Sequence, residues 1–223
     1  LLIIISSGYF SLYLFEIFLV YKDFKFLNKK KIIFNQNTNN DFDTRDIFEV
    51  FLDLNKKHQN VSFFYRHPIN YDENIKNDFV PLSGRANSKT IHCNENGYYS
   101  IYDSDRFGFN NPDDEWKSDE IEYLLLGDSF IHGACVNRPN DVASNLRDNF
   151  NLNVINLGYS SNGPLIEYAT LKEYFNLNFE NIVWVFFEGN DILDFQFERK
   201  NLMLNRYLED SDFNQNLKNK QNK

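Results

Sequence analysis

Three short apolar runs in the second half of the chain constrain its fold more than any other feature. They cover residues 121–127, 154–157 and 182–187, and a block of small and polar residues follows each one. Runs of this kind are typical of strands in a parallel sheet, because helices cover both faces of such a sheet. The sequence therefore predicts an α/β protein with at least three parallel strands.

Two segments between these runs have the pattern of helices. The first spans residues 141–150, with Asn140 or Asp141 as its cap. The second begins at Pro164, a residue that is favoured in the first turn of a helix. Strands that alternate with helices are joined by right-handed crossovers, so the carboxyl ends of the three strands meet at one edge, where open α/β sheets bind ligands. We therefore expect a site at this edge.

Two of the blocks at the strand ends carry residues of a known catalytic pattern. Residues 127–130 read Gly-Asp-Ser-Phe and residues 189–191 read Gly-Asn-Asp. They resemble the first and third blocks of the SGNH hydrolases, also called the GDSL esterase/lipase superfamily. The resemblance implies that Ser129 is the nucleophile and that the Asn190 amide and the Ser129 N–H donate into the oxyanion hole. Asp128 is expected to orient the loop.

The second block is similar to the family pattern but departs from it at one position. It runs from Asn156 to Pro164, and Ser161 stands where the family typically has its oxyanion glycine. The family uses a backbone N–H there, which a serine can also supply. A backbone angle open only to glycine would make this harder for serine. Ser161 is therefore the expected third donor, with Gly163 as the fallback.

The resemblance covers roughly residues 100–200 and implies both a fold and a function. The fold is a three-layer α/β/α, flavodoxin-like SGNH domain with a parallel sheet, of which residues 120–223 hold only the N-terminal part. The function is that of a serine esterase acting on O-acyl esters, and by analogy the substrate is an acylated glycan of the cell envelope. Two alternatives stay open: an O-acyltransferase of the same fold, and a non-catalytic flavodoxin-like module that binds a ligand or partner.

The family's catalytic histidine and its aspartate partner are absent from this chain. They belong to a late D-x-x-H block, yet no histidine follows His132. A serine hydroxyl needs a base to remove its proton, so we expect this fragment not to turn over esters. His132 lies only three residues after Ser129, which favours a packing or pocket-wall role over that of a substitute base.

The first 21 residues are rich in large apolar side chains, with Glu16 as their one charge. A helix of that length spans about 30 Å, so we predict a transmembrane anchor at 1–21, followed by a stalk and lead-in region at 22–119. The lysines after it favour a cytoplasmic location for the following domain. The resemblance to membrane-anchored bacterial members, through residues 102–112, favours an extracytoplasmic one, and we expect the latter.

The charge and the cysteine and histidine content of the chain limit which ligands and partners we expect it to bind. The net charge of −9 argues against binding to nucleic acid. No histidine or cysteine has metal-ligand spacing, so neither metal nor cofactor is expected. Whether Cys93 and Cys135 pair is left open. Because the chain begins at Leu1, has Met203 as its one methionine and lacks the late histidine, we expect a fragment cut at both ends.

Overall fold

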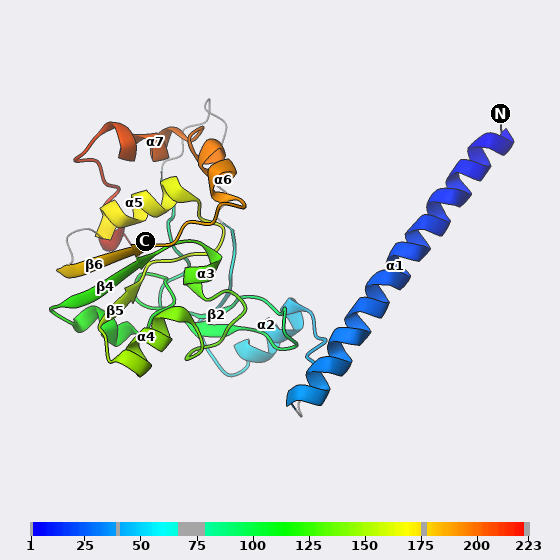
Figure 1. Cartoon of the computed structure of the whole chain (residues 1–223), viewed down its shortest axis with the longest axis horizontal. Coiled ribbons are helices and arrows are strands. Elements are labelled where there is room, and N and C mark those ends of the chain that lie inside the picture. The colour runs from blue at the N-terminus through cyan, green and yellow to red at the C-terminus, as the bar shows by residue number, and fades with distance from the viewer. Residues whose placement is uncertain (1, 39–40, 67–78, 175–177, 221–223) are drawn as a thin grey trace. The chain divides into compact units, whose positions relative to one another are not determined.

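A computed structural model describes residues 2–38, 41–66, 79–174 and 178–220, with side chains from residue 6 onward. These residues form two compact units. The first contains the chain up to Arg45 together with Asn94–Tyr99, and the second contains Asp46–Cys93 and Ser100–Lys223. The elements are shown in Figure 1.

The first unit is built on one long helix, α1 (Leu2–Thr38). The turn at residues 94–99 packs beside the end of this helix, where the Phe34 and Phe42 rings meet edge to face at 5.7 Å. The Asp43 N–H donates to the Gly97 carbonyl at 2.8 Å. Gly97 has φ +88°, and a Cβ there would lie 2.8–2.9 Å from both rings, so this turn requires glycine.

The prediction of a transmembrane helix was wrong. Among the residues the structure describes, no helix is both long and apolar enough to cross a membrane. Ser6, Ser7, Ser11 and Glu16 interrupt the apolar stretch, and α1 continues past residue 21 into a lysine-rich segment. The expected fold class is corrected accordingly, and the membrane anchor at 1–21, the membrane as a partner and the membrane localisation have no support.

The second unit contains a parallel sheet of three strands. They are β4 (Ile121–Leu126), β5 (Val154–Asn156) and β6 (Phe179–Trp184), in the order β5-β4-β6. Both pairings are parallel, with Leu124 opposite Ile155 on one side and Ile182 on the other. The unit is therefore α/β.

Helices lie on both faces of this sheet (Figure 1). On one face are α3 (Ser129–His132) and α4 (Val142–Phe150), and on the other is α5 (Pro164–Tyr174). After β6 the chain forms α6 (Asp191–Glu198), α7 (Leu202–Glu209) and a short 3-10 helix, Leu217–Asn219. Leu165, Ile166 and Ala169 of α5 form a core with Leu204 of α7.

The region expected to be a stalk and lead-in contains folded elements of this same unit. They are α2 (Ile47–Asn55), β1 (Val61–Phe63), β2 (Lys89–Ile91), β3 (Ile101–Asp103) and a 3-10 helix, Asp113–Lys117. The three strands form a second, mixed sheet, in which β1 and β2 are parallel and β3 is antiparallel to β2. The hydroxyl groups of Ser62, Ser88 and Thr90 bond to one another inside it.

The two outer edges of the parallel sheet differ. In β5 the polar backbone groups of Val154 and Asn156 face outward, and side chains bind them. Asn111 accepts the Asn156 N–H at 2.9 Å and donates to the Asn156 carbonyl at 2.8 Å. Arg147 donates to the Val154 carbonyl at 2.7 Å. In the described chain, β6 pairs with β4 and with no further strand.

Candidate active site

The predicted nucleophile lies in the tight turn that joins β4 to α3. Asp128 is the N-cap of α3, and its side chain accepts the Phe130 N–H at 3.1 Å. Ser129 is the first residue of the helix and is partly exposed. Its N–H donates to no acceptor among the described residues, as expected for the first turn of a helix. The turn therefore presents both the hydroxyl and the N–H of Ser129.

Short helix α3 is held in place through its carbonyl groups. Asn156, at the end of β5, donates to the Ile131 carbonyl at 2.6 Å, and Asn110 donates to the His132 carbonyl at 2.9 Å. Gly158 passes so close that a Cβ there would lie 2.5 Å from the Ile131 side chain. The second block and the lead-in thus fix the orientation of the helix that carries Ser129.

Ser161 lies on the loop between β5 and α5 with a φ of +70°. This left-handed conformation is the one that favours glycine, and serine adopts it at a cost of about 1–2 kcal/mol. The Ser161 N–H has no acceptor within the described chain. The Gly163 N–H is already bound to Glu198 Oε1 at 2.7 Å. Of the two expected donors on this loop, only Ser161 therefore has its N–H available.

Asn190 is the N-cap residue of α6, directly after the loop that follows β6. Its amide Nδ2 donates to Asp194 Oδ2 at 2.7 Å, and the other oxygen of Asp194 lies 3.8 Å from Arg66 Nη2. One hydrogen of the amide therefore orients the side chain, and the second is left for another acceptor.

The structure brings Ser129, Ser161 and Asn190 together at one cavity of about 520 Å³. Five more residues line it: Arg66, Asp128, Phe130, Phe187 and Asp194. Asp194 is not among the site residues expected from the sequence. Its position could have indicated this, because Asp194 lies four residues after Asn190 on a helix and can therefore contact it. Arg66 has no such signal, since it comes from a segment more than 60 residues before Ser129.

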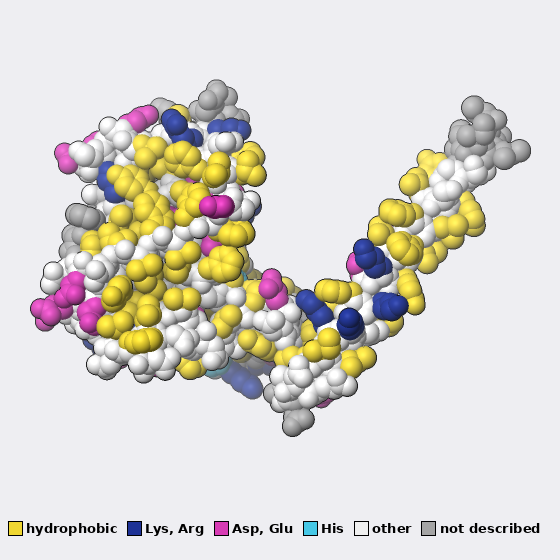
Figure 2. Space-filling model, in the orientation of Figure 1, with side chains coloured by type: hydrophobic (Ala, Val, Ile, Leu, Met, Phe, Trp, Pro, Cys, Tyr) yellow, Lys and Arg dark blue, Asp and Glu magenta, His cyan; other side chains and the backbone are white. Residues whose placement is uncertain are grey.

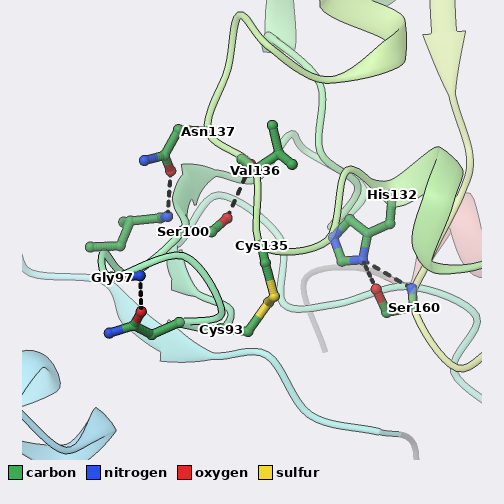
Figure 3. The surroundings of a disulfide bond; sticks show 10 residues. Cys93, Gly97, Ser100, His132, Cys135, Val136, Asn137 and Ser160 are labelled. Carbon is green, nitrogen blue, oxygen red and sulfur yellow. Dashed lines mark hydrogen bonds between the residues drawn. A yellow bond between two sulfur atoms is a disulfide. The ribbon is translucent and has the colours of Figure 1, made fainter. Parts of the chain in front are cut away.

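His132 does not face this cavity. It is fully buried, and its Nδ1 accepts the Ser160 N–H at 2.9 Å, as Figure 3 shows. A backbone N–H can only donate, so the proton of the imidazole is on Nε2, which lies 3.0 Å from Tyr102 Oη. Burial lowers the pKa of His132 well below its usual value. His132 is thus a neutral residue that packs in the core and does not form part of the wall of this cavity.

A disulfide joins Cys93, after β2, to Cys135, after α3 (Figure 3). The two following residues are also held, since the Val136 carbonyl accepts from Ser100 Oγ at 3.1 Å and Asn137 Oδ1 accepts the Ile101 N–H at 2.8 Å. The pairing left open by the sequence is therefore present, and it ties the segment after α3 to the mixed sheet.

Buried carboxyl groups lie behind the site. Burial raises the pKa of Glu167 to about 8, and its Oε2 accepts the Trp184 indole N–H at 2.6 Å. Glu198 accepts hydrogen bonds from the N–H groups of Gly163 and Leu165, and these bonds lower its pKa. Burial has the larger effect and raises the pKa of Glu198 to about 7. Burial also raises the pKa of Asp191. Within the described residues no acidic, histidine or cysteine side chains are grouped as a metal site.

Comparison with known proteins gives no family for this chain. No family model matches it, and neither curated proteins nor solved structures gave a match. The interpretation of the site therefore depends on its own geometry.

Proposed function

We propose that the chain carries the nucleophile and the oxyanion hole of an SGNH-type serine esterase acting on O-acyl esters. The observation that supports this is the convergence of Ser129, Ser161 and Asn190 on one cavity. The three residues come from the ends of three parallel strands, and together they offer a hydroxyl, two unpaired backbone N–H groups and an amide.

In this proposal Ser129 Oγ attacks the ester carbonyl carbon, and its proton passes to a base. The carbonyl oxygen becomes an oxyanion, which accepts hydrogen bonds from the N–H groups of Ser129 and Ser161 and from the Asn190 amide. Collapse of this tetrahedral intermediate expels the alcohol and leaves an acyl group on Ser129, which water then removes. Donors placed at the developing charge lower the barrier because they need no rearrangement during the reaction.

The histidine base that this mechanism uses is not among the residues lining this cavity. None of them is a histidine, and no hydrogen bond joins Ser129 Oγ to another side chain in the described part of the chain. The base therefore has to come from outside this set, and the chain as given should show little or no ester turnover. The same fact favours the second candidate function, a module that binds an acyl or anionic ligand at this cavity without chemistry.

A fluorophosphonate probe distinguishes the two functions when imidazole is added as an external base. We expect imidazole to accelerate covalent labelling of Ser129, located by mass spectrometry, and the variant Ser129→Ala to abolish it. Removing one oxyanion donor costs about 10²–10³ in rate, so Asn190→Ala should slow labelling by that factor. Asn149→Ala, which removes an exposed amide on α4, is the matched control.

Equal labelling rates for Asn190→Ala and the parent protein would contradict the oxyanion assignment. Absence of imidazole-dependent labelling at Ser129 would contradict the nucleophile assignment and leave the binding module as the better description.

A further inference from the structure

We propose that Glu198 is a positioning residue for the Ser161 N–H. Its carboxylate holds the loop at residues 158–163 in the conformation that presents this N–H to the cavity, and the loop loosens when the carboxylate takes up a proton. The positioning concerns the loop alone. Only its consequence for an oxyanion rests on the proposed function.

The hydrogen bonding of this loop leaves one backbone donor unused. Among the described residues, Ser161 is the one member of the loop whose N–H has no acceptor. The N–H groups of the other five residues donate, in chain order, to Asn156 Oδ1, the Gly127 carbonyl, His132 Nδ1, the Tyr159 carbonyl and Glu198 Oε1. The loop therefore offers a single N–H to a ligand in the cavity.

The backbone of Ser161 needs support from both sides. Its φ of +70° is unfavourable for serine, and such conformations persist only where the surroundings hold them. On one side, His132 Nδ1 accepts the Ser160 N–H at 2.9 Å (Figure 3). On the other side, Glu198 Oε1 accepts the Gly163 N–H at 2.7 Å. Two ionisable side chains thus hold the residues next to Ser161.

Glu198 caps α5 from another helix. Because α5 begins at Pro164, the residue before it is Gly163, which has no side chain to bind the unpaired N–H groups of the first turn. Glu198, the last residue of α6, binds them instead, and its Oε2 accepts the N–H groups of Leu165 at 2.9 Å and Ile166 at 3.4 Å. A Cβ at Gly163 would lie 2.7 Å from Glu198 Oε1, so this close approach requires glycine. One carboxylate therefore joins the loop to the helix.

Glu198 is buried without a cation beside it. Charged side chains usually face water, as the dark blue and magenta ones in Figure 2 do, but Glu198 is 1% exposed. No lysine or arginine of the described chain forms an ion pair with it. The charged groups that face it are acidic: Asp194, one turn earlier in α6, and Glu167 of α5. Because burial raises the pKa of Glu198 to about 7, this carboxylate takes up a proton near neutral pH.

Protonation of Glu198 weakens the support of the loop on one side. A hydrogen bond to an ionised acceptor is roughly twice as strong as one to a neutral acceptor. His132 does not change over the same range, because burial lowers its pKa well below the usual value. Both supports are therefore at full strength above about pH 7, whereas only His132 is at full strength below it.

Amide spectra of the full chain, recorded by ¹⁵N–¹H NMR as the pH is raised from about 5.5 to about 9, test the proposal. The Gly163 and Leu165 signals report the bonds to Glu198, and the Ser161 signal reports the loop. We expect all three signals to shift with one common midpoint near pH 7. Glu198→Gln has nearly the same shape but does not titrate, so it should remove this midpoint from all three.

Two control variants identify the group that titrates. Glu209→Gln, at the exposed end of α7, should leave the midpoint in place. Glu167→Gln removes the other buried carboxyl group of raised pKa that faces Glu198, and the midpoint at Gly163 and Ser161 should remain. A Gly163 signal without the midpoint would overturn the proposal, and so would a Ser161 signal that does not follow Gly163. A midpoint that persists at Ser161 in Glu198→Gln would overturn it as well.

Labelling of Ser129 separates this proposal from the proposed function. The imidazole-dependent rate should fall in Glu198→Gln, but by less than the roughly 10²–10³ expected when a whole donor is lost. If the NMR midpoint is as expected and the labelling rate of Glu198→Gln equals that of the parent protein, the positioning of Ser161 stands. The assignment of Ser161 as an oxyanion donor would then be contradicted.

Discussion

The two outer strands of the parallel sheet differ in burial although both were predicted from similar apolar runs. All three residues of β5 are buried, whereas β6 is exposed along most of its length. The difference does not come from the strands themselves. It comes from side chains elsewhere in the chain. Asn111, 45 residues before Asn156, and Arg147 of α4, seven residues before Val154, bind the outward backbone groups of β5 and close its edge. The exposure of an edge strand is therefore decided by what the rest of the chain places beside it.

The largest effect on this difference is expected from replacing the side chain that binds the outward backbone groups of β5. Asn111→Leu keeps the volume but leaves the N–H and C=O groups of Asn156 buried without partners, and it removes a bond to Asp105. Each buried unsatisfied group costs about 1–3 kcal/mol, so we expect a loss of roughly 5 kcal/mol in the free energy of unfolding. Urea denaturation measures it, with Asn149→Ala as an exposed control that should cost little. A loss below about 1 kcal/mol would show that Asn111 does not close this edge.

The disulfide between Cys93 and Cys135 also stabilises the second unit. Cys93 and Cys135 are 42 residues apart, and closing a loop of that length in the unfolded chain stabilises the folded state by about 4 kcal/mol in the chain-entropy account. The double variant Cys93→Ser, Cys135→Ser should therefore unfold at a lower urea concentration. A reducing agent should lower the stability of the parent protein by a similar amount and leave the double variant unchanged. Equal stability with and without the bond would contradict this contribution.

Two matched Ile→Ala substitutions, one in β5 and one in β6, compare how deeply the side chains of the two strands are buried. Ile155 of β5 is 1% exposed and Ile182 of β6 is 40% exposed. Ile155→Ala should destabilise the protein by about 3 kcal/mol, because it leaves a cavity in the core. Ile182→Ala should cost about 1 kcal/mol, since much of that side chain is already in water. Thermal unfolding at one dilute protein concentration gives both values. Equal costs would mean that β6 is covered in the monomer.

The smallest effect concerns the link between β6 and α5. Burial raises the pKa of Glu167 from an ordinary 4.5 to about 8, so the folded state holds a proton that the unfolded state releases first as pH rises. The contribution of Glu167 to the free energy of unfolding is then largest below about pH 4.5, and it falls as the pH rises toward 8. Between pH 5 and pH 6.5 the loss should be on the order of 2 kcal/mol. Glu167→Gln keeps a partner for Trp184 and should remove this part of the pH dependence. An unchanged pH profile would contradict the raised pKa.

Much of the parallel sheet could be predicted from local patterns. β4 and β5 begin at the expected residues, α4 begins one residue after Asp141, and α5 begins at Pro164. β6 runs from Phe179 to Trp184 and not over 182–187, because its pairing extends back to Phe179 opposite Ile121. An edge strand accommodates the polar Glu180 and Asn181, which an apolar run excludes.

The mixed sheet and part of the site could not be predicted. Strands β1 and β2 have three residues each and bury the hydroxyl groups of Ser62 and Thr90, so neither has an apolar run as long as that of β4. Ser129, Ser161 and Asn190 could be placed together because each follows a parallel strand. Arg66 reaches the same cavity through tertiary structure alone.

Residue-resolved amide hydrogen exchange tests the difference between the two edges most directly. In dilute solution the outward N–H of Asn156 should be as protected as the core of the sheet, while those of Ile182 and Trp184 should exchange rapidly. Strong protection of Ile182 and Trp184 in the dilute monomer, or rapid exchange at Asn156, would contradict the account of one closed edge and one open edge.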